Sequence, residues 1–239
     1  DRRPGDLSRQ RRVGLHDRHG ERDRRRLERL TMDMAAIAAL APVIPVLTVE
    51  SRETAVPLAR ALVKGGLSVL EVTLRTEAAL ECLRAIAEEV PEAVVGAGTV
   101  LNPSQLDRVQ RAGARFAVSP GCTRELGLAA RSSGLPFLPG VQTVSEAMTL
   151  AEQGFRHLKF FPADAAGGLT WLKAIGAPLG DLRFCPTGGI TPETAPAYLA
   201  LANVACVGGS WVAPRGAVAT GDWQSVERLA ATASTLKRR

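Results

Sequence analysis

The feature that most constrains the fold is a repeat of about twenty to twenty-five residues, the length of one strand with its crossover helix. The repeat runs from residue 43 onward, and each copy consists of a short apolar run followed by a longer stretch of helical periodicity. Where that stretch meets the next apolar run, a glycine ends the helical part, because glycine tolerates the left-handed backbone of a helix C-terminus. The junctions read "LVKGGLSVLEVT", "VQRAGARFAVSP", "RSSGLPFLPG" and "AEQGFRHLKFF".

The apolar runs predict eight strands. They cover residues 43–48, 68–73, 93–98, 115–119, 136–140, 157–161, 183–188 and 204–209. Residues suited to begin helices lie between them, namely Ser51, Asn102 before Pro103, Thr143 or Ser145, and Thr191 before Pro192. Eight strands alternating with eight helices favour a (β/α)8 TIM barrel, although a doubly wound open sheet would also give the alternation. We expect a short helix in residues 33–40 to cover the bottom of the barrel.

Length and charge indicate one folded domain, residues 32–239, preceded by a tail. The 239 residues are 46% hydrophobic, enough for one sizeable core. Residues 1–31 hold eleven arginines and six acidic residues, so they carry most of the net charge of +6. They contain no Phe, Tyr, Trp or Ile and are expected to be a disordered basic tail that is not native to the fold. A basic arm that binds an acidic partner is the alternative, whereas the nearly neutral remainder gives no case for nucleic-acid binding.

No run reaches the roughly eighteen apolar residues that a membrane span requires. An uncharged stretch at residues 34–49 follows the arginines, but Pro42 and Pro45 interrupt it and no small-residue cleavage site follows, which argues against an export signal. We therefore expect a cytoplasmic protein with no membrane partner. The cysteines lie far apart, fit neither a disulfide framework nor a metal site, and are expected to be reduced core thiols. They are Cys82, Cys122, Cys185 and Cys206.

Polar residues gather where the predicted strands end, and the active sites of (β/α)8 barrels lie at the C-terminal ends of the strands. In chain order they are Glu71, Thr73, Arg75, Thr99, Lys159, Thr187, Gly188, Gly189, Gly208, Gly209 and Ser210. These residues come from separate strands rather than from one local motif. Their convergence at one rim therefore predicts a functional site.

Lys159 is unusual because it stands inside an apolar strand, between Leu158 and Phe160, in a chain with four lysines and twenty-six arginines. Burial disfavours the charged form of an amine, and a neutral lysine attacks ketones to form imines, which withdraw electrons from a neighbouring C–C bond. Strand alternation lets Glu71 point into the barrel, where a carboxylate can transfer protons. The alternative is that Lys159 is a structural cation that Glu71 neutralises, and both roles can hold at once.

The motifs "PTGGI" and "VGGSW" follow the seventh and eighth strands, where this fold often builds a phosphate site from backbone N–H groups. Glycines let the backbone approach an anion, although a lone Gly-Gly pair is usually a turn. Arg75 is able to bind a carboxylate bidentately, with an exposed surface arginine as the alternative.

Six motifs together carry a family resemblance. They are "EVTLRT" (71–76), "GAGTVLNP" (96–103), "SPG" (119–121), "LKFFPA" (158–163), "FCPTGGI" (184–190) and "GGSW" (208–211). In order and spacing, from about Pro42 to Trp223, the chain resembles the 2-keto-3-deoxy-6-phosphogluconate (KDPG) / 4-hydroxy-2-oxoglutarate (KHG) aldolase family. The resemblance implies a metal-independent class I lyase of the Entner–Doudoroff pathway, without a cofactor, that splits KDPG into pyruvate and glyceraldehyde 3-phosphate. It also implies a homotrimer of (β/α)8 subunits.

The resemblance also implies roles for individual residues. Lys159 would form the Schiff base with C2 of the substrate, and Glu71 would act as general acid/base through water, taking the proton of the C4 hydroxyl. The substrate-binding residues would be Arg75 and Thr99 at the pyruvate carboxylate, Thr187 at the sugar hydroxyls, and Pro120 and Phe161 as pocket wall. The phosphate-binding residues would be Gly188, Gly189, Gly209 and Ser210. Two departures concern only pocket detail, namely Asp164 in place of a glutamate and Cys122 in place of a leucine.

Two other functions remain open at this point. The first is a phosphate-binding barrel without imine chemistry, such as a phosphosugar isomerase or a thiamine-phosphate-type synthase. Against it stand the strand lysine and the absence from the sequence of a second acid pair or a metal cluster, with His157 expected to be structural. The second is a nucleic-acid or acidic-partner binder that acts through the tail. Among aldolase substrates, the phosphate motifs favour KDPG over KHG, and both share the pyruvyl half.

Overall fold

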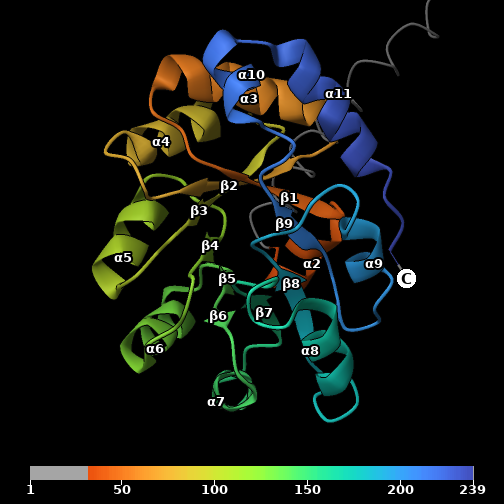
Figure 1. Cartoon of the computed structure of the whole chain (residues 1–239). Helices are drawn as coiled ribbons and strands as arrows, with labels where there is room; N and C mark the ends of the chain where they lie inside the picture. Colours follow the sequence, from red (N-terminus) through yellow and green to blue (C-terminus); the bar gives the residue numbers. More distant parts are fainter. Residues whose placement is uncertain (1–31, 239) are drawn as a thin grey trace, which may run out of the picture. The chain divides into compact units, whose positions relative to one another are not determined.

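The computed structural model describes residues 32–238, and the tail for which we predicted disorder lies outside them. Figure 1 shows the strands gathered at the centre with the helices around them. The strands are β1 Val43–Leu47, β2 Val69–Thr73, β3 Val94–Gly98, β4 Ala117–Val118, β5 Phe137–Leu138, β6 Gly140–Val141, β7 His157–Phe160, β8 Arg183–Pro186 and β9 Val207–Gly209. The helices are α2 Met34–Ala39, α3 Arg52–Lys64, α4 Ala79–Glu89, α5 Pro103–Arg111, α6 Arg124–Ser133, α7 Val144–Glu152, α8 Gly168–Ile175, α9 Ala195–Leu199, α10 Arg215–Thr220 and α11 Trp223–Ser234.

The strands pair in parallel and close on themselves. One ladder runs β5-β4-β3-β2-β1-β9 and the other β6-β7-β8. Parallel bridges from Phe184 to Val204 and from Thr187 to Gly208 join the segment of β8 to that of β9, and β5 continues into β6. The sheet therefore has the circular order of a barrel, and the open-sheet alternative is wrong.

The predicted strand at residues 136–140 is two segments, β5 and β6, separated by Pro139. Proline has no N–H to donate to a ladder, so the pairing breaks there. Ser119 supports the break, since its buried hydroxyl accepts a hydrogen bond from the N–H of Gly140 at 3.3 Å, and the Pro139 carbonyl accepts one from the N–H of Lys159 at 2.8 Å. Nine strand segments thus occupy the eight predicted strand positions.

Two of the four predicted helix starts show the predicted capping chemistry, whereas Ser51 precedes α3 without a capping hydrogen bond from its side chain. The Asn102 side chain accepts from the N–H of Gln105, and Thr143 forms a reciprocal capping box with Glu146. The start predicted at Thr191 is wrong, because α9 begins only at Ala195. Between these two positions threonine side chains hydrogen-bond to one another and to the backbone, which holds a turn in place of the first helical residues.

Aromatic packing fixes which face of β7 points inward. Phe160 stacks on Trp171 of α8 with ring centroids 4.2 Å apart, and Trp171 meets Phe184 of β8 edge to face. Because neighbouring residues of a strand point to opposite faces, Phe160 lies between β7 and α8 while Lys159 points into the barrel.

The short predicted helix is present as α2, with Met34, Ile37 and Ala38 buried. The guanidinium of Arg238 donates to carbonyl groups of this helix, at 2.9 Å to Ala38 and 2.7 Å to Ala39. These contacts tie the C-terminal segment to α2. Among the helices of residues 32–238, none has both the length and the apolar character to cross a membrane.

Candidate active site

Lys159 and Glu71 form an ion pair inside the barrel. The Nζ of Lys159 lies 3.2 Å from Oε1 of Glu71, and the two residues are only 5% and 2% exposed. Their strands, β7 and β2, are separated around the ring by β1, β9 and β8, so the pair reaches across the interior rather than along a ladder. Each of the two buried ions is stabilised by the opposite charge of the other, because a buried ion without a partner is strongly destabilising.

Two neighbours shape the space around this ion pair. A Cβ on Gly98 at the end of β3 would lie 2.2 Å from Oε1 of Glu71, so only glycine leaves room for the carboxylate where it stands. The ring of Phe161 has its centroid 5.2 Å from the Nζ of Lys159 and supplies a partly buried aromatic face toward the cation. Gly98 thus leaves room for the carboxylate, and Phe161 borders the amine.

Arg75 follows β2 and is anchored by two threonines. Its Nε donates to Oγ1 of Thr73 at 3.1 Å, and its Nη2 donates to Oγ1 of Thr48 at 2.9 Å. The hydroxyl of Thr73 in turn donates to the carbonyl of Leu47 at 2.8 Å. Within residues 32–238, no carboxylate forms an ion pair with Arg75. Its remaining N–H groups can therefore serve an anionic ligand.

Thr99, directly after β3, has a backbone φ of 60°, in the left-handed region that non-glycine residues rarely adopt. The flanking backbone is held in place, since the N–H of Val100 donates to Val118 at 3.1 Å and the carbonyl of Gly98 accepts from Leu74 at 2.8 Å. Strain of this kind costs about 1–3 kcal/mol and clusters at active sites and ligand clamps. The conformation of Thr99 supports its place in the site.

The loop after β8 carries the predicted glycine motif. Thr187, nearly buried, bridges to Gly208 of β9, and a Cβ on Gly208 would lie 2.3 Å from its hydroxyl oxygen. Gly188 and Gly189 follow with φ of 96° and 79°, a left-handed pair that favours glycine at both positions. The bridge brings the start of this loop beside β9.

The segment after β9 lies beside the loop that follows β8. Gly209 packs against the ring of Trp211, which a Cβ would overlap, and exposed Ser210 follows it. Within the described part of the chain, no protein acceptor takes the N–H of Gly189 or of Ser210. Backbone N–H groups that face solvent beside a hydroxyl are suited to bind an anion such as phosphate.

The structure brings the predicted site residues together in three groups. Lys159, Glu71 and Phe161 meet in the barrel interior. Thr187 and Gly188 lie near Phe161, since a Cβ on Gly188 would lie 3.3 Å from that ring. Arg75 and Thr99 follow the paired strands β2 and β3, whose register joins Thr73 to Gly98. Pro120 follows β4, and its carbonyl lies against Gly140 of β6.

The cysteines near the barrel interior are buried thiols. Cys185 of β8 and Cys206 are buried, and a hydrogen bond with Cys185, together with burial, raises the pKa of the Cys206 thiol well above its ordinary value. All four cysteines are free; Cys82 is also buried, whereas Cys122 is only partly buried. The expected position in the core is confirmed for three of them. Among residues 32–238, no group of three or more His, Cys, Asp or Glu side chains could hold a metal ion.

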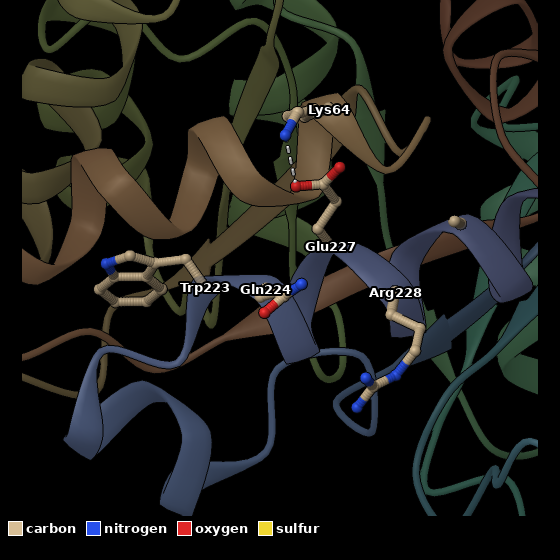
Figure 2. Close-up of a pocket in the computed structure, with 6 residues that line it drawn as sticks. Lys64, Trp223, Gln224, Glu227 and Arg228 are labelled. Atoms are coloured by element: carbon tan, nitrogen blue, oxygen red, sulfur yellow. Dashed lines mark hydrogen bonds and ion pairs between the residues drawn. The ribbon is translucent and has the colours of Figure 1, made fainter.

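A separate surface pocket lies between α3 and α11. It has a volume of about 530 Å³, and an ion pair between Lys64 and Glu227, 2.8 Å long, lies along its wall. Figure 2 shows these two residues with Trp223, Gln224 and Arg228 around the hollow. None of its lining residues belongs to the predicted site, and it has no buried charged group.

Two residues of the site were not predicted from the sequence. Thr48 supports Arg75, and Gly98 makes room for Glu71. The position of Thr48 at the end of an apolar strand was a usable signal, because the other rim residues occupy the same place in their strands. Nothing local distinguishes Gly98 from a turn glycine, since its neighbour comes from another strand.

Comparison with known proteins gives consistent matches. The model of the family described as KDPG and KHG aldolase matches residues 34–229. A KHG/KDPG aldolase of Escherichia coli is 54% identical over 184 residues, which cover 77% of this chain and 86% of that protein. Two solved structures are also similar.

The first structure is a KDPG aldolase from Legionella pneumophila with pyruvate captured at low pH as a covalent carbinolamine intermediate. It has a TM-score of 0.84 and 48% identity, over 85% of this chain and 99% of that one. The second is the KDPG aldolase of Zymomonas mobilis with 3-phosphoglycerate, with a TM-score of 0.83 and 49% identity, over 87% of this chain and 98% of that one. Both agree with the barrel described above. The chain therefore belongs to the KDPG and KHG aldolase family.

Proposed function

We propose that this protein is a class I aldolase that cleaves 2-keto-3-deoxy-6-phosphogluconate into pyruvate and glyceraldehyde 3-phosphate through a Schiff base on Lys159. The observation that carries the proposal is the buried amine of Lys159, 3.2 Å from the Glu71 carboxylate inside the barrel. Relatives of this chain are named for the same reaction, and one of them holds pyruvate as a covalent carbinolamine.

The geometry suits the following sequence of steps. Glu71 accepts a proton from Lys159, and the neutral amine attacks C2 of the keto acid to give a carbinolamine. Glu71 then gives that proton to the carbinolamine hydroxyl, which leaves as water, so that the iminium forms and Glu71 is a carboxylate again. Glu71, through a water molecule, takes the proton of the C4 hydroxyl. The C3–C4 bond breaks, its electrons move to the iminium nitrogen, and the aldehyde leaves. Glu71 gives the proton taken from the C4 hydroxyl to C3 of the resulting enamine, and hydrolysis of the iminium releases pyruvate and restores Lys159.

The two ends of the substrate are assigned to different parts of the rim. Arg75 and Thr99 bind the carboxylate, since the guanidinium has N–H groups to spare and Thr99 holds a strained conformation directly after the neighbouring strand β3. Thr187 contacts the sugar hydroxyls, and Pro120 and Phe161 form the apolar wall. The phosphate is bound by Gly188, Gly189, Gly209 and Ser210. The Zymomonas mobilis relative, solved with 3-phosphoglycerate, supports a site for a phosphorylated ligand.

Cleavage of 4-hydroxy-2-oxoglutarate to pyruvate and glyoxylate is the second activity that we propose. The Escherichia coli relative is named for both substrates, and both carry the pyruvyl half that Lys159 and Arg75 would bind. Because 4-hydroxy-2-oxoglutarate has no phosphate, it leaves the glycine loops unused. We expect a higher KM for it than for KDPG.

Steady-state assays on matched lysine variants test this function. Pyruvate release is followed with lactate dehydrogenase and NADH for each substrate, in the unaltered protein, in Lys159→Met and in Lys173→Met, which changes an exposed lysine of α8. We expect Lys159→Met to have no activity above background and Lys173→Met to match the unaltered protein. Aldol cleavage that survives in Lys159→Met would exclude a Schiff base on Lys159. Unaltered protein that cleaves neither substrate would favour a phosphate-binding isomerase or synthase.

We further propose a cytoplasmic homotrimer, which rests on the family resemblance. Exposed apolar side chains on α6 and α7 offer surfaces for contact between subunits: Leu128, Val144 and Met148 are 52%, 40% and 50% exposed. Light scattering on the eluted protein should give three times the chain mass of 25.3 kDa. A mass that stays at one chain at micromolar concentration would contradict the trimer.

We also propose that residues 32–239 form the single catalytic domain and that the basic tail has no part in catalysis. Every residue assigned to the site lies in the segment from Thr48 to Ser210. Deleting residues 1–31 should leave kcat/KM unchanged. A loss of activity, or salt-dependent RNA or DNA binding that depends on the tail, would give the tail a function.

A further inference from the structure

We propose that Thr48 and Thr73 are positioning residues that fix the guanidinium of Arg75, so that it presents its Nη1/Nη2 end to the substrate carboxylate. This inference deepens the proposed function and rests on it. Neither threonine would touch the substrate. Both would act through Arg75.

Thr73 is the buried half of this support. Its residue is 2% exposed, at the end of β2, and its hydroxyl lies 2.8 Å from the carbonyl of Leu47 and 3.1 Å from Nε of Arg75. A threonine hydroxyl has one hydrogen to donate, and a carbonyl can only accept it. The hydrogen therefore goes to Leu47, which leaves the lone pairs of Thr73 to accept from Nε.

Thr48 is the exposed half, directly after β1. Its Oγ1 accepts from Nη2 of Arg75 at 2.9 Å and lies 3.3 Å from Oγ1 of Thr73. Adjacent strands β1 and β2 thus place two hydroxyl oxygens side by side, spaced to receive the Nε and Nη2 donors of one planar group. The two threonines together occupy the side edge of the guanidinium.

The remaining donors define how a carboxylate can bind. A guanidinium has five N–H groups in a fixed plane, and the threonines take two of them. The Nη1 group and one hydrogen of Nη2 are left, and these form the end of the fork. A carboxylate that approaches this end can accept two parallel hydrogen bonds. The side-on approach through Nε is blocked by the threonines.

The support has little value for stability alone, which is why we assign it to the ligand. Arg75 is exposed, and exposed polar contacts of long side chains contribute little because ordering the side chain opposes them. Holding the guanidinium in advance removes part of that ordering from the binding step. Loss of Thr48 should therefore weaken carboxylate binding while the fold and the phosphate end remain unchanged.

The test uses the full chain and measures the two ends of the substrate separately. Pyruvate-dependent inactivation by borohydride gives the half-saturating pyruvate concentration, and inhibition by inorganic phosphate reports on the phosphate end. Thr48→Val removes the acceptor at constant shape, and Thr48→Ser keeps it. Thr149→Val on α7 changes an exposed threonine away from the rim and serves as a control.

We expect Thr48→Val to raise half-saturating pyruvate about five- to tenfold, the effect of losing one ordinary hydrogen bond at an exposed position. Thr48→Ser should stay within about twofold of the unaltered protein, and phosphate inhibition and melting temperature should not move in either variant. Thr73→Val should raise half-saturating pyruvate at least as much, with some loss of melting temperature because the Leu47 carbonyl loses its donor.

Four results would overturn the inference. Unchanged half-saturating pyruvate in Thr48→Val would show that Arg75 needs no support. Equal impairment in Thr48→Ser, or an equal weakening of pyruvate and phosphate, would show a structural effect. If the unaltered protein shows no pyruvate-dependent inactivation, the proposed function fails and the inference fails with it. Normal inactivation with an unshifted Thr48→Val refutes the positioning role alone.

Discussion

Replacing Lys159 with methionine should destabilise the protein far more than the loss of a single exposed ion pair would. The Lys159 and Glu71 side chains are 7% and 3% exposed, so the change leaves a carboxylate in the barrel interior with neither its ion pair nor solvent. Breaking a buried pair from one side costs about 3–5 kcal/mol. A domain of this length loses about 2–4 °C of melting temperature per kcal/mol, so we expect a fall of roughly 6–20 °C.

The matching change, Glu71→Gln, should also destabilise, since it leaves the ammonium of Lys159 without its charged partner. The double variant Lys159→Met with Glu71→Gln removes both charges and should recover most of the loss, because neutral groups of similar size are tolerated where an unpaired ion is not. Together the four proteins form a double-mutant cycle whose coupling energy measures the interaction between the two residues.

Thermal unfolding of the four proteins, at one protein concentration and one pH near 7, measures the cycle. The concentration is held constant because association of subunits would change the melting temperature by mass action. Additive losses, with the double variant as unstable as the sum of the single changes, would refute the buried ion pair as the cause. The corresponding effect on activity is separate, since all three variants lack a residue assigned to the reaction.

Three further predictions concern single residues. Gly98→Ala should lower kcat by about 10–100-fold, because the added Cβ displaces the Glu71 carboxylate. The control Gly121→Ala should leave kcat unchanged, because a Cβ there would meet nothing within 4 Å. A kcat for Gly98→Ala within twofold of the unaltered protein would contradict this prediction. Burial lowers the pKa of His157 below its ordinary 6.5, so as the pH falls the unfolded chain takes up a proton on this residue before the folded chain does, and stability should fall as the pH drops through and below 6.5. The fall in melting temperature should be smaller in His157→Gln. An identical pH profile of melting temperature in the variant and the unaltered protein would contradict this prediction. Burial raises the pKa of Cys122 to about 11, so native protein at pH 7.5 should alkylate slowly with iodoacetamide, and modification within minutes by mass spectrometry would refute this.

The barrel could be predicted because each repeat carries its own local signals. Glycine after several of the helical stretches and β-branched runs of strand length repeat along the chain, and alternation alone directs Lys159 inward. What failed was local detail. Pro139 divides a strand because its missing N–H breaks the ladder, and α9 begins late because Thr191 and Thr194 bond to each other in a turn.

The site could be predicted as a set of residues but not as a geometry. Strand ends point to one rim, so Glu71, Arg75 and Lys159 were expected near each other. Distances across the barrel depend on register and on packing from distant strands, which no local pattern encodes. The room that Gly98 leaves for Glu71 and the support that Thr48 gives to Arg75 are contacts of this kind.

The most direct test of the Schiff-base chemistry is to trap it. The protein is treated with borohydride in the presence of pyruvate, digested, and analysed by peptide mass spectrometry, because reduction converts an imine into a stable adduct on the lysine that formed it. The account predicts a pyruvate-derived adduct on the peptide that contains Lys159 and none on the peptides of Lys64, Lys173 or Lys237. Active, folded protein that gives no adduct, or an adduct on another lysine, would contradict it.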